Sequence, residues 1–413
     1  DPMVGPWQVP VAGVAVTLAD YHGVAGEAMA IGERTPVAVL DAPASGRLAV
    51  GEALTNLLAA DVASLRDVRL SANWMAACGE PGEDAALYAT VEAIGEQLCP
   101  ALGIAIPVGK DSLSMRTAWK DADGSARAVV APVSLIVSAF APLTDVRRTL
   151  TPQLRHDCGA TVLVLVDLGR GQNRLGASAL AQVCAQLGSG VPDLDDPALL
   201  TGLAAALREL RAADQVLAYH DRSDGGLFAT VVEMAFAGHC GLELALPATR
   251  GDAFAQLFSE ELGVVLQVRA GDLDAVRTTL VRHGFGDDGV VVLGGPDARE
   301  QRIRIRVGAL QFDESWEDLR RAWSETSWLM RGLRDDPDCA REEFEAAVSW
   351  TALPLQVVLS FDPAEDVAAP MVQRGAKPKV AVLREQGVNS QTEMAAALAR
   401  AGFEAVSYTH LTL

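Results

Sequence analysis

Apolar and polar positions alternate along the chain in a pattern that predicts short strands followed by helices. In the first third, leucine and alanine at helical spacing predict helices over 47–60 and 82–98. The strands expected there are 9–17, broken at Gly13, and 36–40, 68–75, 102–108 and 128–140. A second block predicts strands 161–166, 215–219, 241–246, 264–268, 290–293 and 303–307, with helices 177–187, 197–212, 227–237 and 272–282 between them. This alternation indicates α+β or α/β sheet domains.

Two stretches that lack this periodicity, 143–153 and 362–377, predict linkers. They divide the chain into a sheet domain at 1–143, an α+β domain at 154–310, and a helical segment with its linker at 311–377. In the helical segment, three tryptophans share one apolar flank that is typical of core packing: Trp316, Trp323 and Trp328.

Residues 378–406 predict a single strand–loop–helix unit, with a strand from Lys379 to Leu383 and a helix from about Ser390 to Ala401. We expect no second strand to cover it. One such unit cannot bury its own apolar face, so residues 378–413 should be weakly ordered in isolation.

The stretch H-D-R-S-D-G-G-L, from His220 to Leu227, joins a predicted strand to a predicted helix. A strand-to-helix turn leaves backbone N–H groups free at the helix start, and such groups attract phosphate. Asp221 and Asp224 repel a phosphate directly but can hold Mg²⁺, which can bridge to one. An Asx turn that caps the helix without any ligand explains the same residues.

Glu52 and Asn56 stand four apart on the helix predicted over 47–60, so they share one face. Both offer oxygen donors that suit a hard cation such as Mg²⁺. A surface Glu–Asn hydrogen bond is the alternative. The stretch Gly109-Lys110-Asp111-Ser112 lacks the upstream glycine of a P-loop. Lys110 and Asp111 are either groups of an active cleft or part of an ordinary turn.

Composition limits the partners of the protein. The 413 residues carry a formal net charge of −20, which argues against nucleic acid and anionic membranes as partners. Six scattered cysteines without a C-x-x-C pair indicate reduced, buried thiols in a cytosolic protein. We expect neither a membrane span nor a signal peptide. Because the chain begins with Asp, we interpret it as a segment of a longer protein.

Several stretches together resemble one family, the large bacterial phosphoribosylformylglycinamidine synthases. They are G-E-A-L-T-N (51–56), L-S-A-N-W-M (70–75), P-G-E-D (81–84), P-V-G-K-D-S-L-S-M (107–115), H-D-R-S-D-G-G-L (220–227), M-A-F-A-G-H (234–239) and R-E-Q-G-V-N-S (384–390). The resemblance covers about residues 1–406. The last residues, 407–413, do not resemble the family, and we expect them to be a cloning or read-assembly tail.

The resemblance implies a second synthetase half with the two-domain fold of aminoimidazole ribonucleotide synthetase, followed by the start of a class I glutamine amidotransferase domain. The family's ligase uses ATP and glutamine to convert formylglycinamide ribonucleotide to formylglycinamidine ribonucleotide in purine biosynthesis. The catalytic histidine of that reaction lies in the first synthetase half, and the amidotransferase cysteine lies beyond residue 413. This chain is therefore expected to be inactive alone, with those missing domains as its partners.

Carried over residue by residue, the resemblance makes Glu52, Asn56 and Asp221 Mg²⁺ ligands, and makes Ala12 and Ser223 contacts of an auxiliary ATP or ADP. Gly13 stands where the family pattern has an aspartate, which puts the full metal complement in doubt. Two alternatives stay open: a non-catalytic scaffold that holds nucleotide, and a superfamily relative that phosphorylates a small molecule.

Overall fold

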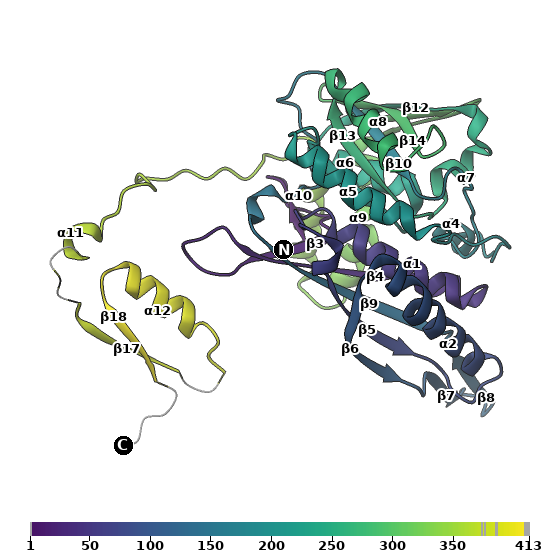
Figure 1. The fold of residues 1–413 in the computed structure, drawn as a ribbon, viewed down its shortest axis with the longest axis horizontal. Coiled ribbons are helices and arrows are strands. Elements are labelled where there is room, and N and C mark those ends of the chain that lie inside the picture. Colours follow the sequence, from purple (N-terminus) through teal and green to yellow (C-terminus); the bar gives the residue numbers. More distant parts are fainter. Residues whose placement is uncertain (1, 373–374, 376, 385–386, 409–413) are drawn as a thin grey trace. The chain divides into compact units, whose positions relative to one another are not determined.

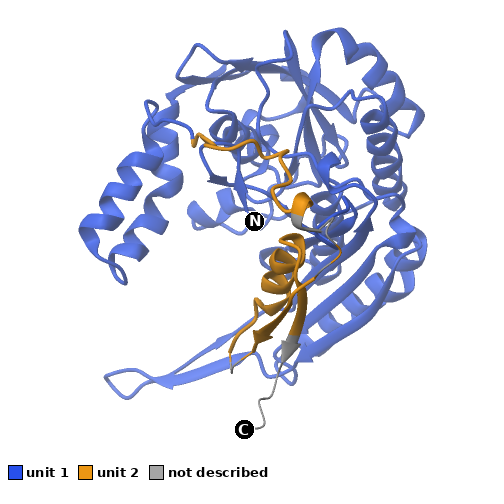
Figure 2. Ribbon diagram, turned by 90° about the vertical axis from the view of Figure 1, so that its left-hand side faces the viewer, with its two compact units in different colours: residues 1–354 blue, residues 355–413 orange. Residues whose placement is uncertain are grey.

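A computed structural model describes residues 2–372, 375, 377–384 and 387–408. The chain divides into two compact units, Asp1–Pro354 and Leu355–Leu413 (Figure 2). The first unit contains both large sheets, and the second contains a small parallel pair of strands (Figure 1).

A five-stranded sheet forms the first part of unit 1 in the order β3-β4-β9-β5-β6. Its strands are β3 Val14–Leu18, β4 Gly26–Glu33, β5 Arg69–Met75, β6 Ala105–Ser112 and β9 Ser134–Leu143. The helices of this part are α1 Ala42–Leu57, α2 Glu83–Glu92 and α3 Cys99–Leu102. Two small ribbons complete it, β1 Met3–Val4 with β2 Val9–Pro10, and β7 Arg116–Lys120 with β8 Ala126–Val130.

Strand β4, which the sequence did not predict, lies directly under α1. Its buried positions are small, and a side chain at Gly32 would collide with the backbone of Ala49 and Ala53 on α1. Such close packing explains why the segment lacks large apolar residues at alternate positions. The predicted strand 36–40 is wrong, since Thr35–Val39 is a 3₁₀ helix with Pro in its first turn.

A seven-stranded sheet forms the second part of unit 1 in the order β11-β13-β10-β14-β12-β15-β16. Its strands are β10 Thr161–Asp167, β11 Ala218–Arg222, β12 Gly241–Leu246, β13 Gly263–Arg269, β14 Val290–Asp297, β15 Arg302–Val307 and β16 Leu310–Ser315. Its helices are α4 Ala179–Val183, α5 Pro197–Ala212, α6 Gly226–Gly238, α7 Ala253–Phe258 and α8 Leu273–Arg282.

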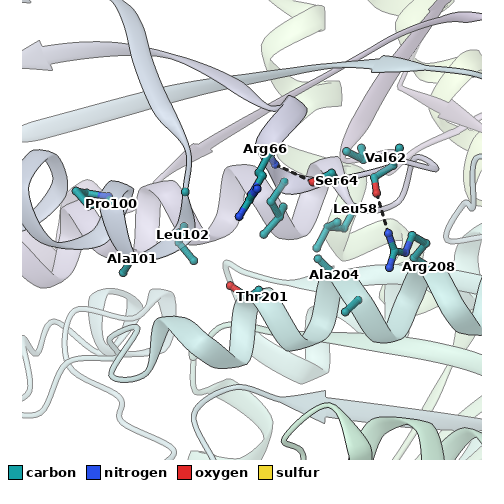
Figure 3. A pocket seen from close by; sticks show the side chains of 14 residues that line it. Leu58, Val62, Ser64, Arg66, Pro100, Ala101, Leu102, Thr201, Ala204 and Arg208 are labelled. Atoms are coloured by element: carbon teal, nitrogen blue, oxygen red, sulfur yellow. Dashed lines mark hydrogen bonds between the residues drawn. The ribbon is translucent and has the colours of Figure 1, made fainter.

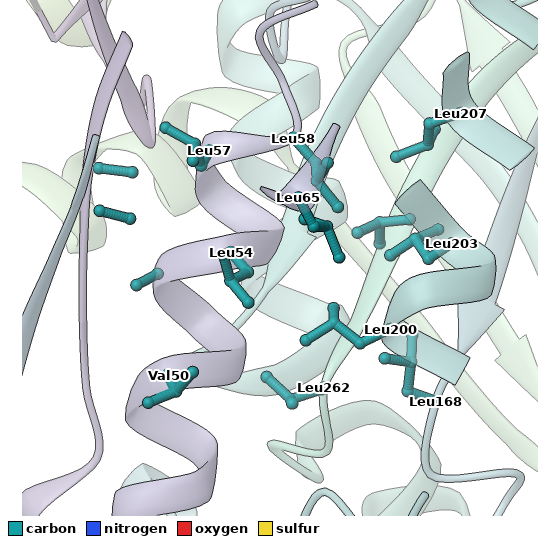
Figure 4. Packing of buried hydrophobic residues seen from close by; sticks show 14 of the residues in the cluster. Val50, Leu54, Leu57, Leu58, Leu65, Leu168, Leu200, Leu203, Leu207 and Leu262 are labelled. Atoms are coloured by element: carbon teal, nitrogen blue, oxygen red, sulfur yellow. The ribbon is translucent and has the colours of Figure 1, made fainter. Parts of the chain in front are cut away.

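One hydrophobic cluster joins the two parts of unit 1. Leucines from α1 and the segment after it, such as Leu54 and Leu58, face leucines of α5 such as Leu200 and Leu203 (Figure 4). These four side chains are at most 3% exposed. The shared core fixes α1, which carries Glu52 and Asn56, against the sheet edge formed by β11.

Helices α9 Trp316–Gly332 and α10 Pro337–Val348 complete unit 1. Aromatic rings tie them to α6, because the His239 ring stacks between Trp7 and Trp350 with centroid distances of 4.4 and 4.5 Å. The predicted apolar flank holds only in part. Trp316 is 2% exposed, whereas Trp323 is 37% exposed.

Unit 2 contains α11 Ala369–Val372, β17 Lys379–Leu383, α12 Gln391–Arg400 and β18 Glu404–Tyr408. Strand β18 pairs with β17 in parallel, so the expectation that no second strand covers this unit is wrong. Of residues 407–413, only 407 and 408 fall within the described part of the chain.

All six cysteines are free, as expected, but Cys78, Cys184 and Cys339 are exposed rather than buried. Within the described ranges, no helix combines the length and the apolar character needed to cross a membrane.

Candidate functional site

The stretch from His220 to Arg222 belongs to β11 and is buried, so these residues do not lie in a turn as predicted. The turn begins at Ser223, and α6 starts at Gly226 after Gly225, whose φ of 77° is left-handed. This shift separates the two aspartates of the motif. Asp221 lies inside the protein, whereas the side chain of Asp224 is 79% exposed.

Arg34 forms ion pairs with Asp224 in this turn and with Glu260 from the segment before β13. Its buried guanidinium pairs with Asp224 Oδ1 at 2.5 Å and with Glu260. The other oxygen of Glu260 accepts the backbone N–H of Gly225 at 2.9 Å. The Gly225 N–H therefore already has a partner. It is not one of the free N–H groups that we predicted at the start of α6.

Asp221 meets the α1 residues on the other side. A Cβ placed on Gly13 would collide with Asn56 Oδ1 and would lie 3.4 Å from Asp221 Oδ1, so these three residues converge. The amide nitrogen of Asn56 donates to the carbonyl of Ile31 at 3.1 Å, which turns its oxygen toward Gly13. That oxygen is buried and has no hydrogen-bond partner among the residues that the structure describes.

Glu52 lies one turn earlier on α1 and accepts the Glu33 backbone N–H at 2.8 Å. The pKa of Glu52 is raised to about 8, mainly by burial; the charge of Arg34 opposes this shift and the charge of Asp221 adds to it. A nearby cation would favour the charged carboxylate.

His220 lies between two carboxylates. Its Nδ1 is 3.1 Å from Asp221 Oδ1 and its Nε2 is 2.9 Å from Glu233 Oε2. Burial alone would lower the pKa of His220, but the hydrogen bonds to Asp221 and Glu233 outweigh it and raise the pKa to about 10. Since an ionised carboxylate only accepts, both ring nitrogens donate.

Two adjoining cavities share the residues Ala12, Gly13 and Val14. The smaller, of about 10 Å³, also touches Asn56 and Asp221, which leaves room for about one water or ion. The larger, of about 320 Å³, extends over the open face of the five-stranded sheet and is lined there by Met29, Ile31 and Phe140. The Asn56 and Asp221 side chains thus lie at a small cavity that adjoins a larger, mainly apolar one.

These residues fit Mg²⁺. The orphaned Asn56 oxygen, the Asp221 carboxylate and the Glu52 carboxylate offer the hard oxygen donors that Mg²⁺ prefers. Asn56 and Asp221 line the small cavity but Glu52 does not, and the described residues contain no group of three or more His, Cys, Asp or Glu that could hold a metal.

The other predicted residues lie elsewhere. Lys110 and Asp111 are exposed in β6 rather than in a turn, where Lys110 donates to Ser112 Oγ at 2.9 Å. They line a separate cavity of about 390 Å³ beside Trp74. Ser223 lies in the turn after β11. Its backbone carbonyl accepts the N–H of Gly226 at 3.0 Å.

Another cavity lies apart from all of these residues. It measures about 420 Å³ and lies between the segment after α1, the end of α3 and α5, with Arg66 and Arg208 at its sides (Figure 3). None of the predicted site residues lines it.

Sequence reasoning missed Arg34 and Glu260, although both contact the predicted turn. A lone arginine and a Glu-Glu pair carry no local signal, because their pairing joins residues 226 positions apart.

Three parts of the chain match known protein families. Residues 1–142 match the family described as FGAR-AT PurM_N-like domain. Residues 159–295 match the C-terminal domain of AIR synthase related protein. Residues 377–413 match the CobB/CobQ-like glutamine amidotransferase domain, and this match includes the residues 407–413 that we expected to be foreign.

Solved structures share the fold. The chain is similar to the structure of PurLQS from Thermotoga maritima, with 15% identity, a TM-score of 0.53, and coverage of 76% of this chain and 47% of that chain. Thermotoga maritima PurL complexed with ATP has 13% identity and a TM-score of 0.51, and the match covers 87% of this chain and 49% of that chain. PurL complexed with FGAR has 13% identity and a TM-score of 0.54, and the match covers 95% of this chain and 54% of that chain. The chain therefore spans about half the length of these proteins.

The fold and its domains define an AIR-synthase-related protein that continues into a glutamine amidotransferase domain. The three matches, in this order, support a segment of the phosphoribosylformylglycinamidine synthase type, with one synthetase half and the start of a glutamine amidotransferase domain.

Proposed function

We propose that this chain is part of a ligase that uses ATP and glutamine to convert formylglycinamide ribonucleotide to formylglycinamidine ribonucleotide in purine biosynthesis. The order of the three matched domains supports this function. Relatives of the same fold have been solved with ATP and with FGAR. The two matched synthetase domains would correspond to residues 1–143 and 154–310, and the amidotransferase domain would begin at 378.

Within the ligase, this half would hold an auxiliary nucleotide with Mg²⁺. Glu52, Asn56 and Asp221 would bind the cation, and Ala12 and Ser223 would contact the nucleotide. The observation that carries this proposal is the buried Asn56 oxygen, which faces Gly13 beside Asp221 and has no partner in the described part of the chain. A buried acceptor without a donor costs free energy unless a ligand satisfies it.

Each residue would have a separate task. Mg²⁺, when bound, would neutralise the phosphate charges and orient the chain of phosphates. Asn56 is held by its bond to Ile31, Asp221 by His220, and Glu52 by the Glu33 backbone N–H, so the donors are oriented before any ligand arrives.

The partners would be the first synthetase half and the rest of the amidotransferase domain. The five-stranded sheet exposes Met29, Ile31 and Phe140, with 44%, 59% and 41% of their surfaces accessible, and such a patch suits a protein partner. We place the protein in the cytoplasm, where its free thiols would stay reduced. Without the first half, this chain would not complete the reaction.

The test is the nucleotide content of the purified 413-residue chain. The protein is denatured, and the supernatant is separated by ion-exchange chromatography, before and after incubation with MgATP. We expect near-stoichiometric ADP or ATP, and EDTA treatment should release it. No nucleotide after incubation with MgATP would contradict the auxiliary site.

ATP turnover decides between the scaffold and the small-molecule kinase that the sequence left open. The chain alone should release no phosphate from ATP above the level of an Asp221→Asn control. Steady turnover would favour the relative that phosphorylates a small molecule.

A further inference from the structure

A continuous chain of hydrogen bonds links Asp221 to helix α9. His220 contacts Asp221 Oδ1 at 3.1 Å and Glu233 Oε2 at 2.9 Å. The second oxygen of Glu233, Oε1, accepts the indole N–H of Trp323 at 2.9 Å. Four side chains from β11, α6 and α9 are thereby joined.

The orientation of Asp221 depends on this chain. Among the described residues, the side-chain hydrogen bonds of the Asp221 carboxylate go to His220 alone. The imidazole ring of His220 is fixed in turn by Glu233, since both ring nitrogens are engaged. A rotation of Glu233 would therefore free the ring and, with it, the carboxylate of Asp221.

Packing holds the indole of Trp323 in place. The guanidinium of Arg320 lies 4.6 Å from the centre of the Trp323 ring and 5.3 Å from that of Phe236. Phe236 and Trp323 themselves meet with centroids 6.0 Å apart. Since Phe236 lies on α6, as Glu233 does, the same helix that carries Glu233 also packs against the Trp323 indole.

Helix α9 lies outside all three matched regions, since it follows residue 295 and precedes residue 377. We propose that α9 is a working part of the cation and nucleotide site, with Glu233 and Trp323 as positioning residues for Asp221. This inference rests on the proposed function of Asp221 as a ligand. It assigns to the helical segment a role beyond that of a spacer between the synthetase and the amidotransferase.

The test uses Mn²⁺ as the probe and the full chain as the protein. Trp323→Phe removes the N–H donor but keeps an aromatic ring under Arg320. Trp328→Phe is the matched control on the same helix, because Trp328 stacks on Phe344 with ring centroids 4.6 Å apart, whereas the indole that donates to Glu233 is that of Trp323. Mn²⁺ affinity is measured by electron paramagnetic resonance and folding by thermal unfolding.

We expect Glu233→Gln and Trp323→Phe to weaken Mn²⁺ binding, by on the order of tenfold for Glu233→Gln, as for other groups that orient metal ligands. The melting temperature of Trp323→Phe should stay at the wild-type value. Trp328→Phe should bind Mn²⁺ as the wild type does. In wild-type protein, the indole N–H resonance of Trp323 should shift on addition of Mg²⁺, an effect that a purely structural contact would not produce.

Two failures are distinguishable. If the wild type binds Mn²⁺ and Trp323→Phe binds it equally well, with no shift of the indole resonance, the positioning role is overturned and the proposed site stands. If the wild type binds neither Mn²⁺ nor nucleotide, the proposed site itself is overturned, and the positioning role with it.

Discussion

Arg34 donates to Asp224 Oδ1 over 2.5 Å, so one of the two aspartates in the H-D-R-S-D-G-G motif is already in an ion pair. The other, Asp221, faces His220 and the Asn56 oxygen instead. The two carboxylates are three residues apart in sequence, but they belong to different environments. This difference gives them separable roles.

Nucleotide retention should separate these roles. Asp221→Asn should reduce the nucleotide bound to the purified chain at least several-fold, because the substitution removes a charged donor from the proposed cation site. Asp224→Asn should leave retention near the wild-type level. Nucleotide per protein is measured after denaturation, at matched concentrations of MgATP.

Thermal unfolding of the same two variants supplies the control. Asp224 is exposed, and Arg34 keeps its second partner Glu260 when Asp224 is replaced, so a small loss of stability of about 0–1 kcal/mol is expected. Equal losses of nucleotide in both variants would contradict the assignment of Asp221 as the ligand.

Gly13 and Asn56 compete for the same space. A Cβ at position 13 would collide with Asn56 Oδ1, so Gly13→Ala should destabilise the protein by about 1–3 kcal/mol. In an Asn56→Ala background the same substitution should cost far less. Urea unfolding of the two single variants and the double variant measures this coupling.

Gly13→Asp then tests the missing carboxylate. Its Cβ meets Asn56 Oδ1 as that of Gly13→Ala does, and it restores the aspartate of the family pattern. Mg²⁺ should therefore raise the melting temperature of Gly13→Asp more than that of Gly13→Ala. An identical response of the two variants to Mg²⁺ would show that a carboxylate at position 13 does not reach the cation.

Local patterns were sufficient to predict much of the fold. Helix 197–212 and strand 241–246 match the observed α5 and β12 in full, because each has a clear periodicity and a clear end. Glu52 and Asn56 could be paired from their spacing on one helix face. In each case the signal lies within a few residues.

The remaining features depend on contacts between distant segments. Strand β4 was missed because α1 packs on it so closely that only small residues fit there. Arg34 and Glu260 were missed because their partners come from another part of the chain. The division of the motif into a buried strand and an exposed turn follows from the pairing of β11 with β13, which no local pattern reveals.

The arginine of the motif has a structural task that can be tested. Arg222 is 1% exposed and pairs with Asp167 Oδ1 at 2.6 Å, while Asp167 Oδ2 pairs with Arg250 at 3.0 Å. Asp167→Ala would leave the Arg222 charge buried without its partner, so we expect a loss of about 3–5 kcal/mol in urea unfolding. Asp195→Ala is the control, since Asp195 is half exposed and its loss should cost about 0–1 kcal/mol. Similar losses in both variants would contradict the account.

His239 should make stability depend on pH. Burial lowers the pKa of this ring, which stacks between Trp7 and Trp350, against the opposing effect of the Trp350 carbonyl. A lowered pKa means that the folded state favours the neutral ring. The associated stability is therefore present above the unfolded pKa of about 6.5 and is lost as the pH falls through the lower folded value.

The free energy of unfolding, measured from pH 8 to pH 5, should therefore fall more steeply for wild type than for His239→Asn. The difference between the two proteins isolates His239 from the carboxylates that titrate in the same range. Parallel curves would show that the stack is indifferent to the charge of the ring.

Unit 2 should exchange its amide hydrogens much faster than the core of unit 1. Its parallel pair β17–β18 has one helix beside it, and Val382 is the only apolar side chain of the described residues in this unit that is buried. Two strands with so little buried apolar surface are marginally stable in water. By contrast, β10 lies between β13 and β14, and Val164 and Val166 are 0% exposed.

Hydrogen exchange with peptide-level mass spectrometry should therefore show rapid exchange over 379–383 and 404–408 and slow exchange over 161–167. Strand β18 pairs backbone groups of β17 but does not supply an apolar core, so rapid exchange of unit 2 is still expected. Protection of 379–383 as strong as that of 161–167 would mean that some other surface covers unit 2.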